Sequence, residues 1–156
     1  MSQKAEKTVS KELKVVSRPV VSIDDAVRDE KKVSVLGIVR SLGEVSERGL
    51  INCLYILKTE KGKDIGYPFQ VIGSVVNSRE MLEDVRVLLY LGLLEVTEAR
   101  KLKLTSLGRE MLDKLSDKQK EIVEELSKVV EEIKQRVLSE DNLLNILSGS
   151  RGRRRR

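Results

Sequence analysis

The sequence predicts a mainly helical α+β fold that ends in a long C-terminal helix. Three patterns support this fold class. Apolar residues between positions 81 and 89 recur at the spacing of one helix face. Between residues 94 and 105 apolar and polar residues alternate, which is the period of a strand pair. From residue 122 to residue 133 apolar residues return to helical spacing, which predicts the C-terminal helix.

The elements between residues 79 and 115 follow a recognisable order. Gly92 ends the first helix, because glycine adopts the positive φ of a helix C-terminus without steric cost. The polar turn 98–100 then joins two short strands, and Thr105 begins another helix. Helix, strand, basic turn, strand and helix is the order of parts in a winged helix-turn-helix domain.

Three runs of sequence carry a resemblance to a family. They are LINCLYILKTEKGKDIGYPF, DVRVLLYLGLLEV and KLKLTSLGREMLDKL. Together they resemble the MarR/PadR-like winged-helix proteins, particularly the compact archaeal forms, over about residues 47 to 138. The resemblance implies that the helix before Gly92 lies in the major groove of DNA and that the hairpin touches phosphates or the minor groove. It also implies that helices outside the core form a dimer.

The earlier elements are predicted from capping residues. Ser22 and Asp25 indicate a capping box that opens a short helix, and we expect the charged end of that helix, 28–32, to be solvated. Residues 33–42 alternate partly like a strand, but their apolar stripe favours a helix. Ser46 begins the next helix, and Asn77 or Ser78 begins the helix before Gly92.

Four regions follow from this order. We expect a flexible N-terminal arm over 1–20, a winged-helix domain over 21–115, a C-terminal helix over 116–147 and a disordered arginine-rich tail over 148–156. Within the third region Asp141 is expected to cap a short separate helix or hook.

Composition limits the partners and the chemistry. The chain is 40% hydrophobic but only 3% aromatic, so its core consists of Leu, Val and Ile, and 35% charged residues without His or Trp suggest a thermophilic source. Five of the 30 Lys and Arg residues lie in the last six positions, so the other 25 balance 25 acidic residues. Nucleic-acid binding by the folded part must therefore depend on a local patch.

No pattern predicts an enzyme. The sequence has no phosphate-binding loop, no His to act as a general base and no Cys and His set for a metal, so we expect no cofactor and no catalysis. Cys53 lies among apolar residues, where a buried inert thiol is expected. No secretory leader and no apolar run of about 20 residues is present, so we expect a cytoplasmic protein without a membrane partner.

Candidate nucleic-acid contacts occur at three places. The predicted recognition helix carries Arg79 and Arg86, each able to contact guanine, but also Glu80, Glu83 and Asp84, which a phosphate-lined groove repels. The hairpin and the tail supply the other cations. The resemblance and its charge both associate the hairpin with phosphate, whereas the tail is associated with phosphate by its charge alone. Each feature also has an alternative explanation. The hairpin cations could protect an exposed edge strand from pairing with another chain, and the tail could serve solubility alone. These residues are Arg100, Lys101, Lys103, Arg151, Arg153, Arg154, Arg155 and Arg156.

Two further features allow alternatives. The segment Tyr67-Pro68-Phe69 is either an aromatic platform for a base or a structural plug between helix and hairpin, and the plug is favoured. The C-terminal helix either forms a homodimer or packs on its own domain. We favour the dimer, because the preceding domain has its own core residues. The dimerisation stripe is Ile122, Leu126, Val129 and Ile133.

The sequence therefore predicts a DNA-binding winged-helix protein, either a homodimeric transcriptional regulator or a chromatin-associated factor. The alternatives are a protein-interaction subunit of a larger nucleic-acid machine and an RNA-binding factor that uses its basic tail. No small-molecule substrate is evident.

Overall fold

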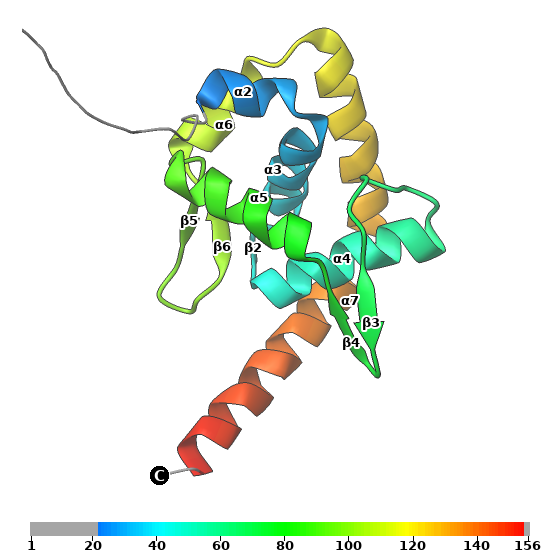
Figure 1. Cartoon of the computed structure of the whole chain (residues 1–156), viewed down its shortest axis with the longest axis vertical. Coiled ribbons are helices and arrows are strands. Elements are labelled where there is room, and N and C mark those ends of the chain that lie inside the picture. Colours follow the sequence, from blue (N-terminus) through cyan, green and yellow to red (C-terminus); the bar gives the residue numbers. More distant parts are fainter. Residues whose placement is uncertain (1–21, 155–156) are drawn as a thin grey trace, which may run out of the picture.

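The computed structural model describes the backbone of residues 22–154 and the side chains of residues 22–143. The predicted N-terminal arm, residues 1–20, and the predicted contacts of Arg155 and Arg156 lie outside the described residues. The described chain is mainly helical with a small antiparallel sheet, as the predicted α+β class requires (Figure 1). No helix in the described part of the chain is long and apolar enough to cross a bilayer.

The elements follow one another in a fixed order. They are α2 (Ile23–Arg28), α3 (Glu30–Leu42), β2 (Glu44–Val45), α4 (Glu47–Glu60), β3 (Gln70–Ile72), β4 (Val75–Asn77), α5 (Arg79–Tyr90), β5 (Leu94–Val96), β6 (Leu102–Leu104), α6 (Ser106–Asp113) and α7 (Asp117–Arg154). Strands β2, β6 and β5 form one antiparallel sheet with β6 in the centre, and β3 and β4 form a separate two-stranded sheet.

The predicted helix ends are confirmed where local capping decides them. Ser22 and Asp25 form the capping box of α2, and the Ser46 hydroxyl accepts a hydrogen bond from the Gly49 N–H at the start of α4. Thr105 caps α6 in the same way, while Ser78 and not Asn77 caps α5. Gly92 has φ 78°, the left-handed conformation that ends α5.

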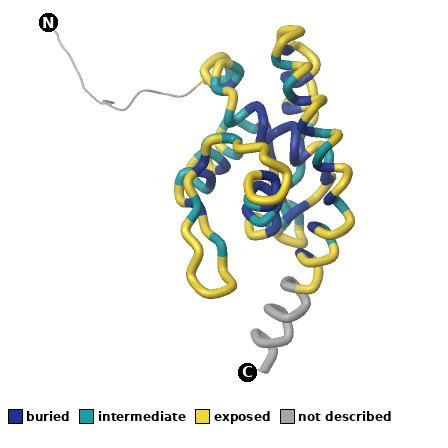
Figure 2. The backbone as a smooth tube through the Cα atoms, turned by 90° about the vertical axis from the view of Figure 1, so that its right-hand side faces the viewer, coloured by how far each residue is buried: buried dark blue, intermediate teal, exposed yellow. Residues whose placement is uncertain are grey.

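The core lies around α3, which is buried along most of its length. Figure 2 shows the buried residues gathered in the middle of the molecule and the exposed ones along its outer helices and hairpins. Val45, Leu94, Leu102 and Leu104 bring the three-stranded sheet into the same core. Cys53 is fully buried there, and burial raises the pKa of its thiol to about 12, so this cysteine is protonated as the sequence predicts.

Helix α7 packs on its own chain, against α3 and α4. Gly37 of α3 permits this approach, because a Cβ at that position would lie 2.7 Å from Cγ1 of Val123. The Arg136 guanidinium also makes two 2.9 Å hydrogen bonds to the Glu60 carboxylate at the end of α4. The described part of the chain therefore has one core, to which the predicted C-terminal region belongs.

This packing corrects the prediction of a dimer through the C-terminal helix. Leu126 and Ile133 are 6% and 5% exposed within their own chain, and Ile122 and Val129 are half-buried. The buried apolar face of α7 consists of Val123, Leu126, Val130, Ile133 and Val137. This face is rotated about the helix axis relative to the predicted dimerisation stripe. Two of the four predicted dimer residues, Leu126 and Ile133, are therefore covered by the chain itself, where α7 packs on α3 and α4.

The C-terminal boundaries also differ from the prediction. Helix α7 continues without a break from Asp117 to Arg154, so Asp141 caps no separate helix and the backbone of residues 148–154 is helical. Asp141 instead lies inside α7 with 1% of its surface exposed. Its carboxylate accepts hydrogen bonds from the backbone N–H of Ser46 at 2.9 Å and from the Ser46 hydroxyl. The residue that looked like a cap thus fixes α7 to the start of α4.

Candidate nucleic-acid interface

Helix α5 presents one exposed stripe to solvent. Met81, Val85 and Leu88 are buried and fix the rotation of the helix on the core. The exposed residues are spaced four, three and four positions apart, which places them along a single face. They are Arg79, Glu83, Arg86 and Tyr90, the last with 76% of its surface exposed.

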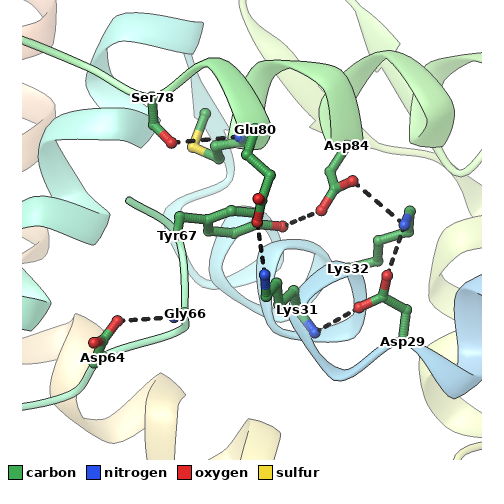
Figure 3. A network of polar contacts seen from close by, with 10 residues as sticks. Asp29, Lys31, Lys32, Asp64, Gly66, Tyr67, Ser78, Glu80 and Asp84 are labelled. Carbon is green, nitrogen blue, oxygen red and sulfur yellow. Dashed lines mark hydrogen bonds and ion pairs between the residues drawn. The ribbon is translucent and has the colours of Figure 1, made fainter. Parts of the chain in front are cut away.

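Two of the three acidic residues of α5 point away from this stripe and toward α3. The Nζ atom of Lys31 lies 2.6 Å from a Glu80 carboxylate oxygen, and that of Lys32 lies 3.3 Å from an Asp84 oxygen (Figure 3). Lys32 also binds Asp29 at 2.7 Å. The expected excess of negative charge on the outer face of α5 is therefore absent, because α3 neutralises Glu80 and Asp84.

The expectation that residues 28–32 are solvated holds for Arg28 and Glu30, which are exposed, but not for Asp29 and Lys32, which are partly buried in polar contacts. Asp29 caps α3, its side chain accepting a hydrogen bond from the Lys31 N–H at 3.0 Å. Burial by itself would lower the pKa of Lys32, but the hydrogen bond to Asp29 and the charge of Asp84 raise it. The hydrogen bond to Glu80 likewise raises the pKa of Lys31. Both lysines therefore carry their charge at neutral pH.

Tyr67 is buried, as expected for a structural plug, but it contacts Lys31 of α3 and Asp84 of α5 instead of lying between a helix and the hairpin. Its side chain is 1% exposed, and its hydroxyl donates a 2.7 Å hydrogen bond to Asp84 (Figure 3). Burial first, and then the bond to the Asp84 carboxylate, raises the pKa of Tyr67, so the hydroxyl keeps the proton it donates. Phe69 is half-buried and meets Tyr55 edge to face, with ring centroids 5.5 Å apart. The buried Tyr67 ring offers no surface to a base, and the Nζ atom of Lys58 lies over the Phe69 ring, 5.6 Å from its centroid.

The β5–β6 hairpin has Arg100 at its turn. Arg100 is exposed and has φ 62°, and its N–H donates to the Thr97 carbonyl at 2.9 Å, which closes the turn. Lys101 is less free, since its Nζ donates to the Asn142 side-chain oxygen of α7 at 2.7 Å. Lys103 lies in the central strand directly opposite Glu44 on one side and Glu95 on the other. Of the three predicted cations, Arg100 is the one presented outward.

The arginines near the C-terminus lie on the last turns of α7. The backbone of Arg151, Arg153 and Arg154 is helical. In Figure 1 this end of α7 extends beyond the body of the molecule, on the side toward which both hairpins point. The last contacts between described side chains of α7 and the body come from two successive residues, Asp141 to Ser46 and Asn142 to Lys101. The sequence does not signal either contact, because both partners lie far away along the chain.

The predicted nucleic-acid-binding residues do not all lie on one surface patch. Arg79 and Arg86 share a face of α5, whereas Arg100 lies on the turn of a hairpin that follows this helix. Arg79, Arg86 and Arg100 are exposed, and no ion pair joins them to another residue in the part of the chain whose side chains the structure describes. Comparison with protein-family models, with curated proteins and with solved structures found no match.

Proposed function

We propose that this chain is a winged-helix protein that binds duplex DNA, as transcriptional regulators and chromatin-associated factors do. The order of α3, β2, α4, α5 and the β5–β6 hairpin supports this assignment, as does the place of β6 between β2 and β5. Helix α5 is then the recognition helix and the β5–β6 hairpin is the wing.

The observation that carries the proposal is the pairing of Glu80 and Asp84 with Lys31 and Lys32. A carboxylate facing the groove would be repelled by phosphate, but these two are bound to cations of α3. What α5 presents outward is two arginines, one glutamate and one tyrosine. Arginine is the commonest side chain to contact guanine in the major groove, and tyrosine can donate to phosphate.

One feature departs from a simple helix-turn-helix. Residues 61–78 separate α4 from α5 and include the β3–β4 hairpin, whereas the usual connection has about three or four residues. The position of α5 therefore depends on its contacts with α3 and on Tyr67, more than on the turn that precedes it. In this proposal the polar network replaces a tight turn as the support of the recognition helix.

The test is binding to random-sequence duplex DNA across a salt series, measured by fluorescence anisotropy. We expect affinity to fall steeply with salt, and we expect Arg79→Ala with Arg86→Ala to weaken binding about tenfold or more. The control pair is Lys118→Ala with Lys120→Ala, which removes two exposed cations from the first turns of α7. If the protein does not bind in low salt, or if the control pair weakens binding as much, the proposed interface is wrong.

A variant that ends at Gly149 separates the body from the arginine-rich end. If both contribute, this variant binds more weakly than the full chain and has a smaller salt dependence, because fewer counterions are released. Arg79→Ala with Arg86→Ala should still weaken it further. An interface confined to the C-terminal arginines would instead leave the shortened variant unable to bind. Matched RNA and DNA duplexes in the same assay distinguish a DNA-binding protein from an RNA-binding factor.

A second candidate is a protein-interaction subunit within a nucleic-acid machine. The observation that favours it is the exposed apolar surface of the β3–β4 hairpin, which DNA binding by α5 does not use. A partner that co-purifies from the native cell in a fixed ratio, and that releases on substitution of this hairpin, would support it.

A further inference from the structure

The β3–β4 hairpin is an apolar surface in a highly charged chain. Residues 65–78 contain no charged side chain, although 35% of the chain is charged. Three valine or isoleucine side chains of the hairpin are nevertheless exposed. Their exposed fractions are 50% for Val71, 79% for Ile72 and 55% for Val75. Burying β-branched apolar side chains is favourable, so this exposure indicates a contact surface.

The two faces of the hairpin differ in their surroundings. Val71 and Val76 lie opposite each other on one face, and Val76 packs against the core, where β4 contacts α4. The opposite face of the hairpin is exposed to solvent. Ile72 pairs with Val75 next to the turn and Gln70 pairs with Asn77 at the base, and all four side chains are exposed. Figure 1 shows the hairpin projecting from the body beside the start of α5, and Figure 2 shows exposed residues along it.

The edges of this small sheet lack the usual protection. No third strand pairs with β3 or β4 among the described residues. Exposed edges in natural proteins commonly carry lysine, proline or a bulge, which prevent pairing with another chain. Within the strands Gln70–Ile72 and Val75–Asn77 there is neither a charge nor a proline. A two-stranded hairpin is also only marginally stable by itself, so an added partner would stabilise it.

We propose that the β3–β4 hairpin contacts the same hairpin of a second copy, forming a two-fold homodimer. A two-fold interface places one surface against itself, so a charged surface would meet like charge, whereas this one has none. Apolar Ile72 and Val75 meet apolar side chains. The amides of Gln70 and Asn77 both donate and accept hydrogen bonds, so they can pair with their own copies.

Duplex DNA fits this hairpin less well than a second copy. Segment 65–78 offers no cation to phosphate, and protein surfaces that bind DNA are rich in positive charge. The inference does not depend on the proposed DNA binding, because it concerns a different surface and is tested without nucleic acid. The contact area of two short hairpins is small, so we expect the dimer to dissociate in the micromolar range.

The experiment is sedimentation velocity of the full chain from low micromolar to about millimolar concentration, without DNA. We expect the mass to rise with concentration from 17.7 kDa toward twice that value. Ile72→Lys and, separately, Val75→Lys should raise the dissociation constant at least tenfold, because each places like charges across the two-fold contact. The matched control is Val96→Lys, an equally β-branched residue with 54% exposure on β5, which should leave the dimer unchanged.

Two results would overturn the proposal: a protein that stays monomeric throughout the range, or a dimer that both hairpin variants leave intact. Far-UV circular dichroism and the melting temperature of each variant establish that it is folded, as the exposure of both positions leads us to expect. If the protein is monomeric and the hairpin variants instead weaken DNA binding or release a different protein, the hairpin has another partner and the homodimer is excluded.

Discussion

At the scale of single residues, Asp141 shows how a side chain acquires a role that its neighbours in sequence do not suggest. It follows a helical stripe and precedes an apolar run, which is the position of a cap. In the structure it is buried against the start of α4, where its carboxylate accepts from both the N–H and the hydroxyl of Ser46. The negative charge also lies at the N-terminus of α4, which the helix dipole favours.

The Asp141→Ala substitution tests this contact. We expect it to lower the free energy of unfolding by about 2 kcal/mol, because a hydrogen-bonded carboxylate is removed and a backbone N–H loses its partner. The measurement is urea unfolding followed by circular dichroism. Glu140→Ala is the control. The adjacent Glu140 is exposed, and its ion pair with Arg136 is long, at 3.9 Å. If both variants lose the same stability, the Asp141 contact contributes nothing specific.

Gly108 is a second single residue whose role depends on a distant part of the chain, because its missing side chain allows a close approach between elements. A Cβ there would lie 2.4 Å from the carbonyl oxygen of Leu93 and 2.7 Å from Cδ1 of Leu104. Helix α6 can approach the sheet this closely only because residue 108 has no side chain. The Thr-x-x-Gly pattern of the sequence is therefore explained by packing, with Thr105 as the cap and Gly108 as the contact.

At the scale of elements, α5 is held on α3 by a polar network as well as by its apolar face. Lys31 pairs with Glu80, and Lys32 pairs with Asp84 and with Asp29, the cap of α3. The Tyr67 hydroxyl donates to Asp84 from the segment before β3. These contacts orient α5 so that Arg79 and Arg86 face outward. The outward charge of the proposed recognition helix thus depends on the residues beneath it.

The Tyr67→Phe substitution measures the contribution of the hydroxyl. Its hydrogen bond to a carboxylate in a buried position contributes about 2 kcal/mol, so we expect a loss of that size in the free energy of unfolding. Tyr90→Phe is the matched control, and its 76% exposed side chain should change stability by less than about 0.5 kcal/mol. Equal unfolding midpoints for Tyr67→Phe and the unsubstituted protein would show that the Tyr67 hydroxyl does not stabilise the fold.

At the scale of the whole molecule, one core joins α3, the sheet and α7, and ion pairs between distant segments surround it. Stability also depends on pH through a local pair, Asp29 with Lys32, at the start of the central helix α3. Burial by itself would raise the pKa of Asp29, but its hydrogen bonds and the charge of Lys32 lower it below 3.8. A lowered pKa in the folded state stabilises the protein above the ordinary value and loses this effect as pH falls through the folded value.

We therefore expect the melting temperature to fall as pH is lowered below about 4, where Asp29 takes up a proton. Asp29→Asn should be less stable than the unsubstituted protein at pH 7, and the difference should shrink in this acidic range. Differential scanning calorimetry between neutral and acidic pH tests this expectation. A difference that is constant across the whole range would exclude Asp29 as a source of the acid sensitivity.

The sequence by itself determined what depends on neighbours a few residues apart. Capping at Ser22, Ser46 and Thr105, the stop at Gly92 and the change of period after it each involve short-range geometry, so the helices and the β5–β6 hairpin could be predicted. Helical periodicity also indicated that the C-terminal helix has an apolar face, but not what covers that face.

The tertiary structure decided which surfaces remain free. Lys31 and Glu80 are 49 positions apart in the sequence, and Ser46 and Asp141 are 95 apart, so no local pattern encodes these pairs. The Lys31–Glu80 and Lys32–Asp84 pairs set two acids of α5 against α3, and the Ser46–Asp141 pair fixed α7 on its own chain. A side chain finds its partner through the packing of distant segments, and that packing is settled only when the whole chain has folded.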